Sequence, residues 1–79
     1  LVFTTNPRKL GISNREARDF HRYAVALGFS AARRGNRLIY RHPNVSQSVV
    51  AHLTVSDRRG YQNLKAQLRR VLRQAGLIA

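Results

Sequence analysis

The segment FSAARRGNRLIYRH, residues 29–42, decides how this chain folds. It consists of two short runs, 29–34 and 37–42, which are separated by Gly35-Asn36. Gly and Asn both tolerate positive φ, so this dipeptide between two such runs is typical of a tight β-hairpin turn. The segment therefore predicts two antiparallel strands in the middle of the chain.

A third strand is predicted directly after this hairpin. Pro43-Asn44 marks a turn, and residues 48–55 then alternate in polarity. Successive side chains of a strand point to opposite faces of its sheet. One face would carry Val49, Ala51, Leu53 and Val55, and the other Val50, His52 and Thr54. The three runs together predict an antiparallel meander.

A helix is predicted on the N-terminal side of the hairpin. Ser13 and Glu16 have the spacing of a capping box. Apolar residues follow at intervals of three and four, as on one face of a helix, at Ala17, Phe20, Ala24 and Leu27. Arg15, Arg18 and Arg22 fall on roughly the opposite face. Gly28 is suited to the position just past the helix end, which predicts about fourteen helical residues.

A second helix is predicted after the third strand. Ser56-Asp57 offers an N-cap, with a carboxylate at the positive end of the helix dipole. A second apolar stripe consists of Leu64, Leu68, Val71, Leu72 and Ala75. Gly76 would end this helix as Gly28 ends the first.

The predicted order is helix, strand, strand, strand, helix. Both apolar stripes enter one core if a three-stranded antiparallel sheet carries both helices on one face, which is an α+β two-layer αβββα sandwich. Double-stranded-RNA-binding domains (dsRBDs) have this order, and they contact phosphates and 2′-hydroxyls by shape. Residues 1–12, with Pro7 and Gly11, are interpreted as an extended basic arm, and residues 13–79 as a single domain.

The charge of the chain points to a polyanionic partner. Fifteen Lys and Arg face three acidic residues, a formal net charge of +12. The positive electrostatic field of such a chain attracts polyanions. Thirteen of the fifteen cations are Arg, which binds phosphate through two parallel hydrogen-bond donors. RNA or DNA is therefore the leading partner class. An acidic protein or an anionic membrane would suit the same charge, but the core needs both apolar stripes, which disfavours a membrane role.

Several other classes are disfavoured by what the sequence lacks. There is no Cys and the three His are scattered, so neither a metal site nor another cofactor is expected. No apolar run approaches the roughly 18 residues that cross a bilayer, and the first residues do not resemble a secretion signal. We therefore expect a cytoplasmic protein, although a start at Leu1 suggests a trimmed chain.

Three segments resemble one family. Residues 35–43, GNRLIYRHP, are similar to the "GSHHIFRHP"-like hairpin of the HicA family, the small mRNA-interferase toxins of bacterial toxin–antitoxin pairs. Residues 68–77, LRRVLRQAGL, resemble the closing "LRxILKQAGL" helix of that family, and the helix leading into residues 27–29 resembles its "LLxxxGF" segment. The resemblance covers approximately residues 16–77. It implies a dsRBD-like fold, RNA as substrate and an acidic, HicB-type antitoxin as partner.

The sequence differs from this family at the position of its catalytic residue. The resemblance implies RNA cleavage by a His two residues after the hairpin Gly, and this chain has Arg37 there. RNA cleavage without metal needs a base, and an Arg with a pKa above about 12 cannot be one. Arg37 can still stabilise charge on a phosphoryl group, so catalysis is lost or rebuilt. His42 and His52 are the remaining candidates: an acid–base pair on neighbouring strands, or two surface imidazoles, with His42 shaping a turn.

The candidate phosphate-binding residues form two groups. One group lies on the second predicted helix, at its positive N-terminus and along one side: Arg58, Arg59, Lys65, Arg69 and Arg73. The other lies on the hairpin: Arg33, Arg34, Arg37 and Arg41. Each group has an ordinary interpretation as solvated surface, but a solvated face normally mixes signs. Tyr40 and Tyr61 are candidates for base stacking or for the core.

Several functions remain open from the sequence. The first is an RNA-binding, HicA-like protein without the family's catalytic group. The second is a non-catalytic DNA-binding regulator or architectural protein, and the third is an active mRNA interferase that uses His42 or His52. The basic surface would also dock an acidic, antitoxin-like protein.

Overall fold

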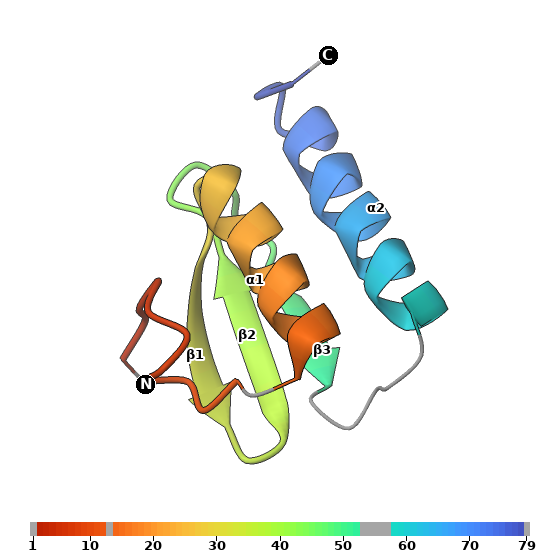
Figure 1. Ribbon diagram of the computed structural model, residues 1–79. Coiled ribbons are helices and arrows are strands. Elements are labelled where there is room, and N and C mark those ends of the chain that lie inside the picture. Colours follow the sequence, from red (N-terminus) through yellow and green to blue (C-terminus); the bar gives the residue numbers. More distant parts are fainter. Residues whose placement is uncertain (1, 13, 53–57, 79) are drawn as a thin grey trace.

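The computed structural model contains two helices and one sheet, in the predicted order (Figure 1). The elements are α1 (Arg15–Ala26), β1 (Ser30–Arg34), β2 (Arg37–Arg41), β3 (Val49–His52) and α2 (Arg58–Gln74). The structure describes residues 2–12, 14–52 and 58–78, without the side chain of Arg58. The prediction of an α+β, αβββα two-layer architecture is confirmed. No helix in the described ranges is long and apolar enough to span a bilayer.

Helix α1 begins one residue later than the predicted capping box. Asn14 is the N-cap, and its Oδ1 accepts the backbone N–H of Glu16 at 2.8 Å. The cap predicted at Ser13 is therefore wrong, and Ser13 itself lies outside the described residues. Asn and Ser are nearly equivalent caps, so the side chain at either position can satisfy a free N–H of the first turn.

Both helices end in the same way, as predicted. After α1, Phe29 N–H donates to the Ala24 carbonyl at 3.0 Å, and Gly28 has a φ of +96°. After α2, Leu77 N–H donates to the Leu72 carbonyl at 2.9 Å, and Gly76 has a φ of +75°. These are Schellman motifs, in which a glycine adopts the left-handed conformation and exposed carbonyls gain donors. The N-cap predicted for α2 at 56–57 lies outside the described residues.

The sheet is an antiparallel meander in the order β1-β2-β3. Gly35 at the first hairpin turn has a φ of +62°, while Asn36 keeps a negative φ, so only one of the two residues uses the left-handed region. Strand β3 covers Val49–His52, and the predicted continuation through residues 53–55 lies outside the described residues. Leu38 pairs with Ala51, and Tyr40 pairs with Val49.

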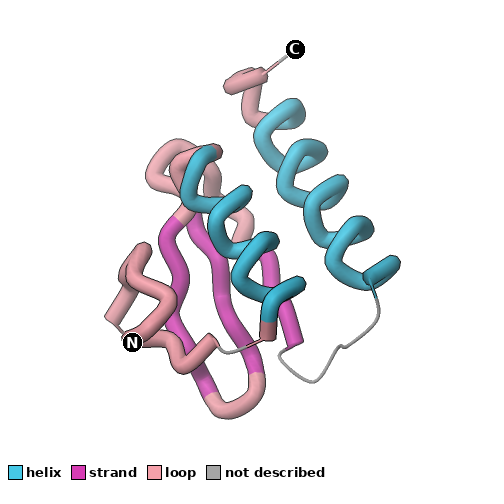
Figure 2. Tube along the Cα trace, in the orientation of Figure 1, coloured by secondary structure: helices cyan, strands magenta, loops and turns pink. Residues whose placement is uncertain are grey.

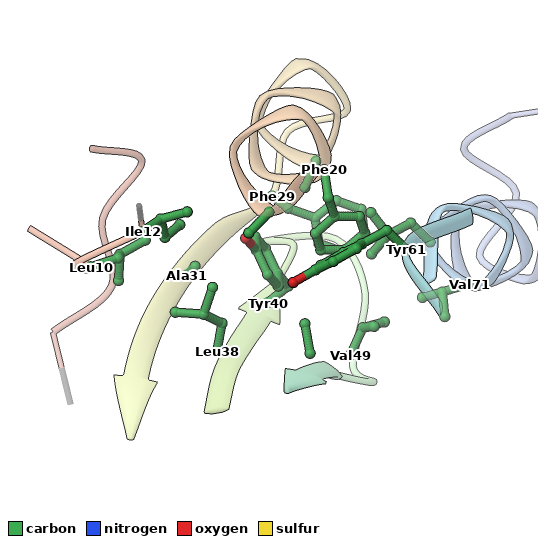
Figure 3. Close-up of a cluster of buried hydrophobic side chains, with 14 of the residues drawn as sticks. Leu10, Ile12, Phe20, Phe29, Ala31, Leu38, Tyr40, Val49, Tyr61 and Val71 are labelled. Carbon is green, nitrogen blue, oxygen red and sulfur yellow. The ribbon is translucent and has the colours of Figure 1, made fainter. Parts of the chain in front are cut away.

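One face of the sheet forms the core with both helices (Figure 3). Tyr40, at the centre of β2, is fully buried, and its ring meets the edge of Phe20 of α1 at 5.2 Å between centroids. Tyr61 of α2 lies 6.0 Å from Phe20, so three aromatic rings join the sheet to both helices. The apolar stripes face the core as predicted, with Leu27 and Leu64 half-buried and Ala75 exposed.

The N-terminal segment is part of the domain and extended only at its start. Thr4 pairs with Ala31 at the outer edge of β1, with N···O distances of 2.8 and 2.9 Å. Residues 7–11 then form turns, in which Pro7 accepts the N–H groups of Leu10 and Ile12. Leu10 and Ile12 are buried in the core. The prediction of an extended arm is wrong for residues 7–11, where backbone hydrogen bonds to the Pro7 and Arg8 carbonyls form turns.

Gly28 provides a direct test of this packing. A Cβ at Gly28 would lie 2.8 Å from Nε2 of His42, whereas one at Gly76 would meet nothing within 4 Å. Both positions have positive φ, which costs a non-glycine residue about 1 kcal/mol. We expect Gly28→Ala to lower the free energy of unfolding by clearly more than Gly76→Ala does, measured by urea denaturation. The double variant Gly28→Ala/His42→Ala lacks the imidazole and should therefore lose less stability to the clash. Equal losses in Gly28→Ala and Gly76→Ala would contradict the proposed contact between position 28 and His42.

Candidate nucleic-acid interface

The face of the sheet away from the helices carries a row of three basic side chains. Arg34 of β1 pairs with Arg37 of β2, and Arg37 pairs with His52 of β3. Directly paired residues project from the same face, and neighbouring strands lie about 4.8 Å apart. All three side chains are exposed. We call this face the open face, and the row Arg34, Arg37 and His52 the basic row.

The basic row is electrostatically unfavourable without a partner anion. Like charges directly opposite each other on adjacent strands are destabilising. The chain has three carboxylate side chains, of which Glu16 and Asp19 lie on α1 and Asp57 lies outside the described residues. Within the described residues no carboxylate is on the sheet beside the basic row.

An apolar row lies next to the basic row on the same face. Ala32, Ile39 and Val50 are paired across the three strands. Val50 remains 39% exposed, and Ile39 is half-buried. Arg34, Arg37, Ile39 and Val50 line a shallow hollow of about 360 Å³. The open face therefore offers cations beside an exposed apolar surface, a combination that suits a sugar–phosphate chain and its bases.

Another cation lies at the other end of the open face. Arg41 is exposed, and its guanidinium carbon lies 5.7 Å from the centroid of the Phe3 ring. Arg41 lies four positions after Arg37 on β2, so the same face holds cations at both ends of the strand. Arg34, Arg37 and Arg41 of the predicted hairpin set are therefore brought to one surface.

Arg33 does not belong to that surface. It pairs with Leu38, whose side chain is in the core, and so it projects from the opposite face to Arg34. Its Nε donates to the Gly35 carbonyl at 2.9 Å, and one terminal nitrogen donates to the Leu10 carbonyl at 2.9 Å. Arg33 holds the N-terminal segment against the hairpin, and the structure does not bring it to the basic row.

Two of the predicted cations of α2 lie against α1. The Lys65 ammonium is 5.4 Å from the centroid of the Tyr23 ring, and Arg69 donates to the Tyr23 hydroxyl at 3.1 Å. Lys65 is half-buried, while Arg69 remains exposed. These two residues support the packing of the helices, a contact that spacing along α2 alone does not reveal.

The other predicted cations of α2 lie along the same helix. Arg59 and Arg73 are exposed and each has an interaction partner. Arg58 is the first residue of α2, and its side chain lies outside the described part. Because the helices cover the core face of the sheet, the α2 cations and the basic row belong to different layers (Figure 2). The predicted binding residues therefore form two surfaces.

His42 and His52 do not form a pair. His52 is opposite Arg37 at the start of β2, whereas His42 follows the last residue of that strand. His42 lies five positions after Arg37, and an extended chain covers roughly 16 Å over that length. The Nδ1 of His42 accepts the Asn44 N–H at 3.1 Å, and its ring meets Phe29 edge-on at 5.3 Å. The acid–base pair is therefore contradicted, and the alternative interpretation of His42 as a turn-shaping residue agrees with its contacts.

The two tyrosines proposed for base stacking are both buried. Tyr40 and Tyr61 have exposed fractions of 0% and 4%. The stacking interpretation is wrong for both, because their rings fill the space between the sheet and the helices. The Tyr61 hydroxyl has no hydrogen-bond partner among the described residues.

A buried histidine was not recognised from the sequence. His21 of α1 is 3% exposed. Its Nε2 lies 2.8 Å from the Thr5 carbonyl, which can only accept, and its Nδ1 lies 2.9 Å from the Tyr40 hydroxyl. The neutral ring is thus protonated at Nε2 and accepts the Tyr40 proton at Nδ1. His21 lies at the i+4 position of the helix face that begins at Ala17, and its two polar partners make its burial there favourable.

The chain lacks features of a metal centre in the part that the structure describes. No three His, Asp or Glu side chains come together there.

Comparisons with known proteins do not identify a family. No family model, no curated protein sequence and no solved structure matches this chain.

Tyr40 predicts a pH dependence of stability. Burial, and secondarily the neighbouring Tyr61, raises the pKa of Tyr40 well above its usual value near 10. The stabilisation due to neutral Tyr40 is therefore complete below about pH 10 and is lost as the pH rises toward the folded-state pKa. We expect the free energy of unfolding, measured in urea from pH 8 to 11, to fall at the alkaline end.

The variant Tyr40→Phe isolates this contribution. It should cost about 1–2 kcal/mol at pH 8, because the Nδ1 of His21 loses its donor. Above pH 10 its stability should decline less steeply than that of the parent. An identical alkaline slope in both proteins would contradict the assignment to Tyr40.

Proposed function

We propose that the protein binds RNA by placing its sugar–phosphate chain along the open face. The basic row provides two guanidinium groups and an imidazole for phosphate oxygens. In the apolar row, half-buried Ile39 and exposed Val50 provide a surface for bases beside them. This proposal includes no cofactor.

One observation carries the proposal. Arg34, Arg37 and His52 stand side by side on three paired strands, with no carboxylate on the described sheet to neutralise them. A phosphate would convert this repulsion into charge-assisted hydrogen bonds. Arg also forms planar, two-point contacts with phosphate that an ammonium group cannot form.

The resemblance to HicA toxins favours RNA over DNA. It puts Arg37, at the centre of the basic row, at the position where that family is thought to carry its catalytic His. The αβββα fold is also the order of elements in domains that recognise RNA. The same face would be the natural surface for an acidic, antitoxin-like protein to cover.

Arg37→Gln tests the binding surface. We expect the variant to bind a single-stranded RNA about fivefold more weakly, and the salt dependence of log K to become shallower by roughly 0.7 for one lost phosphate contact. Fluorescence anisotropy of a labelled RNA at several salt concentrations measures both quantities. Arg70→Gln removes the same charge from an exposed position on α2 and is the matched control.

Equal losses in the two variants would refute binding at the open face, because only the net charge would then matter. A duplex DNA that competes as strongly as RNA would support the alternative of a DNA-binding regulator.

A second candidate function, RNA cleavage, is favoured by His52. This exposed imidazole is directly opposite Arg37, so a base and a charge-stabilising cation are on adjacent strands. In this reaction His52 would take the proton of a 2′-hydroxyl as its oxygen bonds to phosphorus. The bond from phosphorus to the 5′-oxygen would break, and that oxygen would take a proton from water. Arg37 would stabilise charge on the non-bridging oxygens.

His52→Ala decides between the two functions. If the protein cleaves RNA, the variant should lose at least about a hundredfold in rate while it still binds RNA. An assay of end-labelled RNA on a gel measures cleavage. Intact RNA with the parent protein would exclude this activity. Cleavage gained by Arg37→His would then show that the parent lacks only the catalytic group.

A further inference from the structure

A second basic hollow lies between the N-terminal segment and α1, apart from the open face. Its volume is about 600 Å³, within the range of small-ligand pockets. The segment pairs with the edge of β1 through Thr4 and then folds back beside α1 (Figure 1). The lining residues are Thr5, Pro7, Arg8, Gly11, Ile12, Arg18, His21, Arg22 and Val25.

Arginines reach this hollow from both of its sides. Arg8 comes from the turn of the N-terminal segment, and Arg18 and Arg22 come from successive turns of α1. All three are exposed. Like charges four residues apart on a helix are destabilising, so an anion bound beside Arg18 and Arg22 would be favourable.

The local carboxylates do not neutralise these arginines. Glu16 and Asp19 of α1 line a different hollow, together with Arg15 and Lys65. That hollow lies toward α2, since Tyr61 and Gln62 also line it. The described acidic groups of α1 thus lie toward α2. The charged residues that α1 contributes to the hollow beside the N-terminal segment are both arginines, Arg18 and Arg22.

The walls of the hollow are held in place. The Nε of Arg18 donates to the Ile12 carbonyl at 3.1 Å, which fixes the base of its guanidinium and leaves the terminal nitrogens for a ligand. His21 donates to the Thr5 carbonyl at 2.8 Å and ties the opposite wall to α1. The Arg8 N–H donates to Asn6 Oδ1 at 3.0 Å within the turn. This preorganisation reduces the entropy lost on binding.

Part of the remaining lining is apolar, beside Thr5, Gly11 and His21. Pro7, Ile12 and Val25 contribute to it, and the volume is larger than a phosphate group requires. A ligand that fills the hollow therefore combines an anionic group with a larger, weakly polar group. A nucleotide has this composition.

We propose that this hollow binds a nucleotide. Its phosphate lies among the guanidinium groups of Arg8, Arg18 and Arg22, and its base lies against the apolar lining. The nucleotide is either free or one unit of a nucleic-acid strand, and the chemistry of recognition is the same in both cases. The site does not depend on RNA binding by the open face.

Isothermal titration calorimetry with 5′-AMP tests this site. Arg22→Gln should weaken AMP binding about tenfold, the effect of losing a charge-assisted hydrogen bond. The matched control is Arg15→Gln, which removes the same charge from the same helix, outside the lining of the hollow. It should change the affinity by less than about twofold. Because Arg22 is exposed, its replacement leaves the core intact.

Further titrations identify the ligand and its source. AMP should bind more tightly than both inorganic phosphate and adenosine; equal affinity for AMP and phosphate would overturn nucleotide recognition. Weakening of both AMP and an oligonucleotide by Arg22→Gln would indicate a strand as the source, and weakening of AMP alone a free nucleotide. Loss of AMP binding in Arg37→Gln rather than Arg22→Gln would place the nucleotide on the open face and overturn the proposal, as would equal losses in Arg15→Gln and Arg22→Gln.

Discussion

Side-chain alternation along β2 is the constraint on which the rest of this structure depends. Leu38 and Tyr40 project into the core, and the three residues Arg37, Ile39 and Arg41 project from the other face. Tyr40 contacts Phe20 and His21 of α1, so the same five-residue strand organises the hydrophobic core and presents cations. A shift of one residue in register would bury the arginines and expose the tyrosine, which fixes the pairing with β1 and β3.

The cations of this protein are distributed over different surfaces and have different surroundings. The open face holds Arg34, Arg37 and Arg41, while other cations are bound to the protein itself. Arg33 donates to backbone carbonyls, and Arg69 donates to Tyr23. Within the described residues no carboxylate lies on the sheet, and Glu16 and Asp19 line a different hollow from that of Arg8, Arg18 and Arg22. The net charge of the sequence does not distinguish these two kinds of cation.

The sequence predicted the features that local chemistry determines. The Gly35-Asn36 turn, the two helix-ending glycines and the periods of two and about 3.6 residues each depend on neighbours in the chain, and they identified all five elements. The cap of α1 was misplaced by one residue because Ser13 and Asn14 are both good caps. The fold class therefore followed from the sequence.

The candidate site was less predictable, because it depends on contacts between distant residues. The pairing of His52 with Arg37 requires the register of β3, and the role of Lys65 requires the position of Tyr23 on another helix. The hollow beside α1 requires the turns of residues 7–11, and Leu10 and Ile12 anchor this segment in the core. No pattern within one segment shows these contacts.

The most direct measurement of RNA binding by the open face is an NMR titration of the ¹⁵N-labelled protein with a short single-stranded RNA. The largest amide shifts are expected on β1, β2 and β3 around Arg34, Arg37 and His52, with small changes along α2. Shifts confined to α2, with the three strands unchanged, would contradict RNA binding by the basic row.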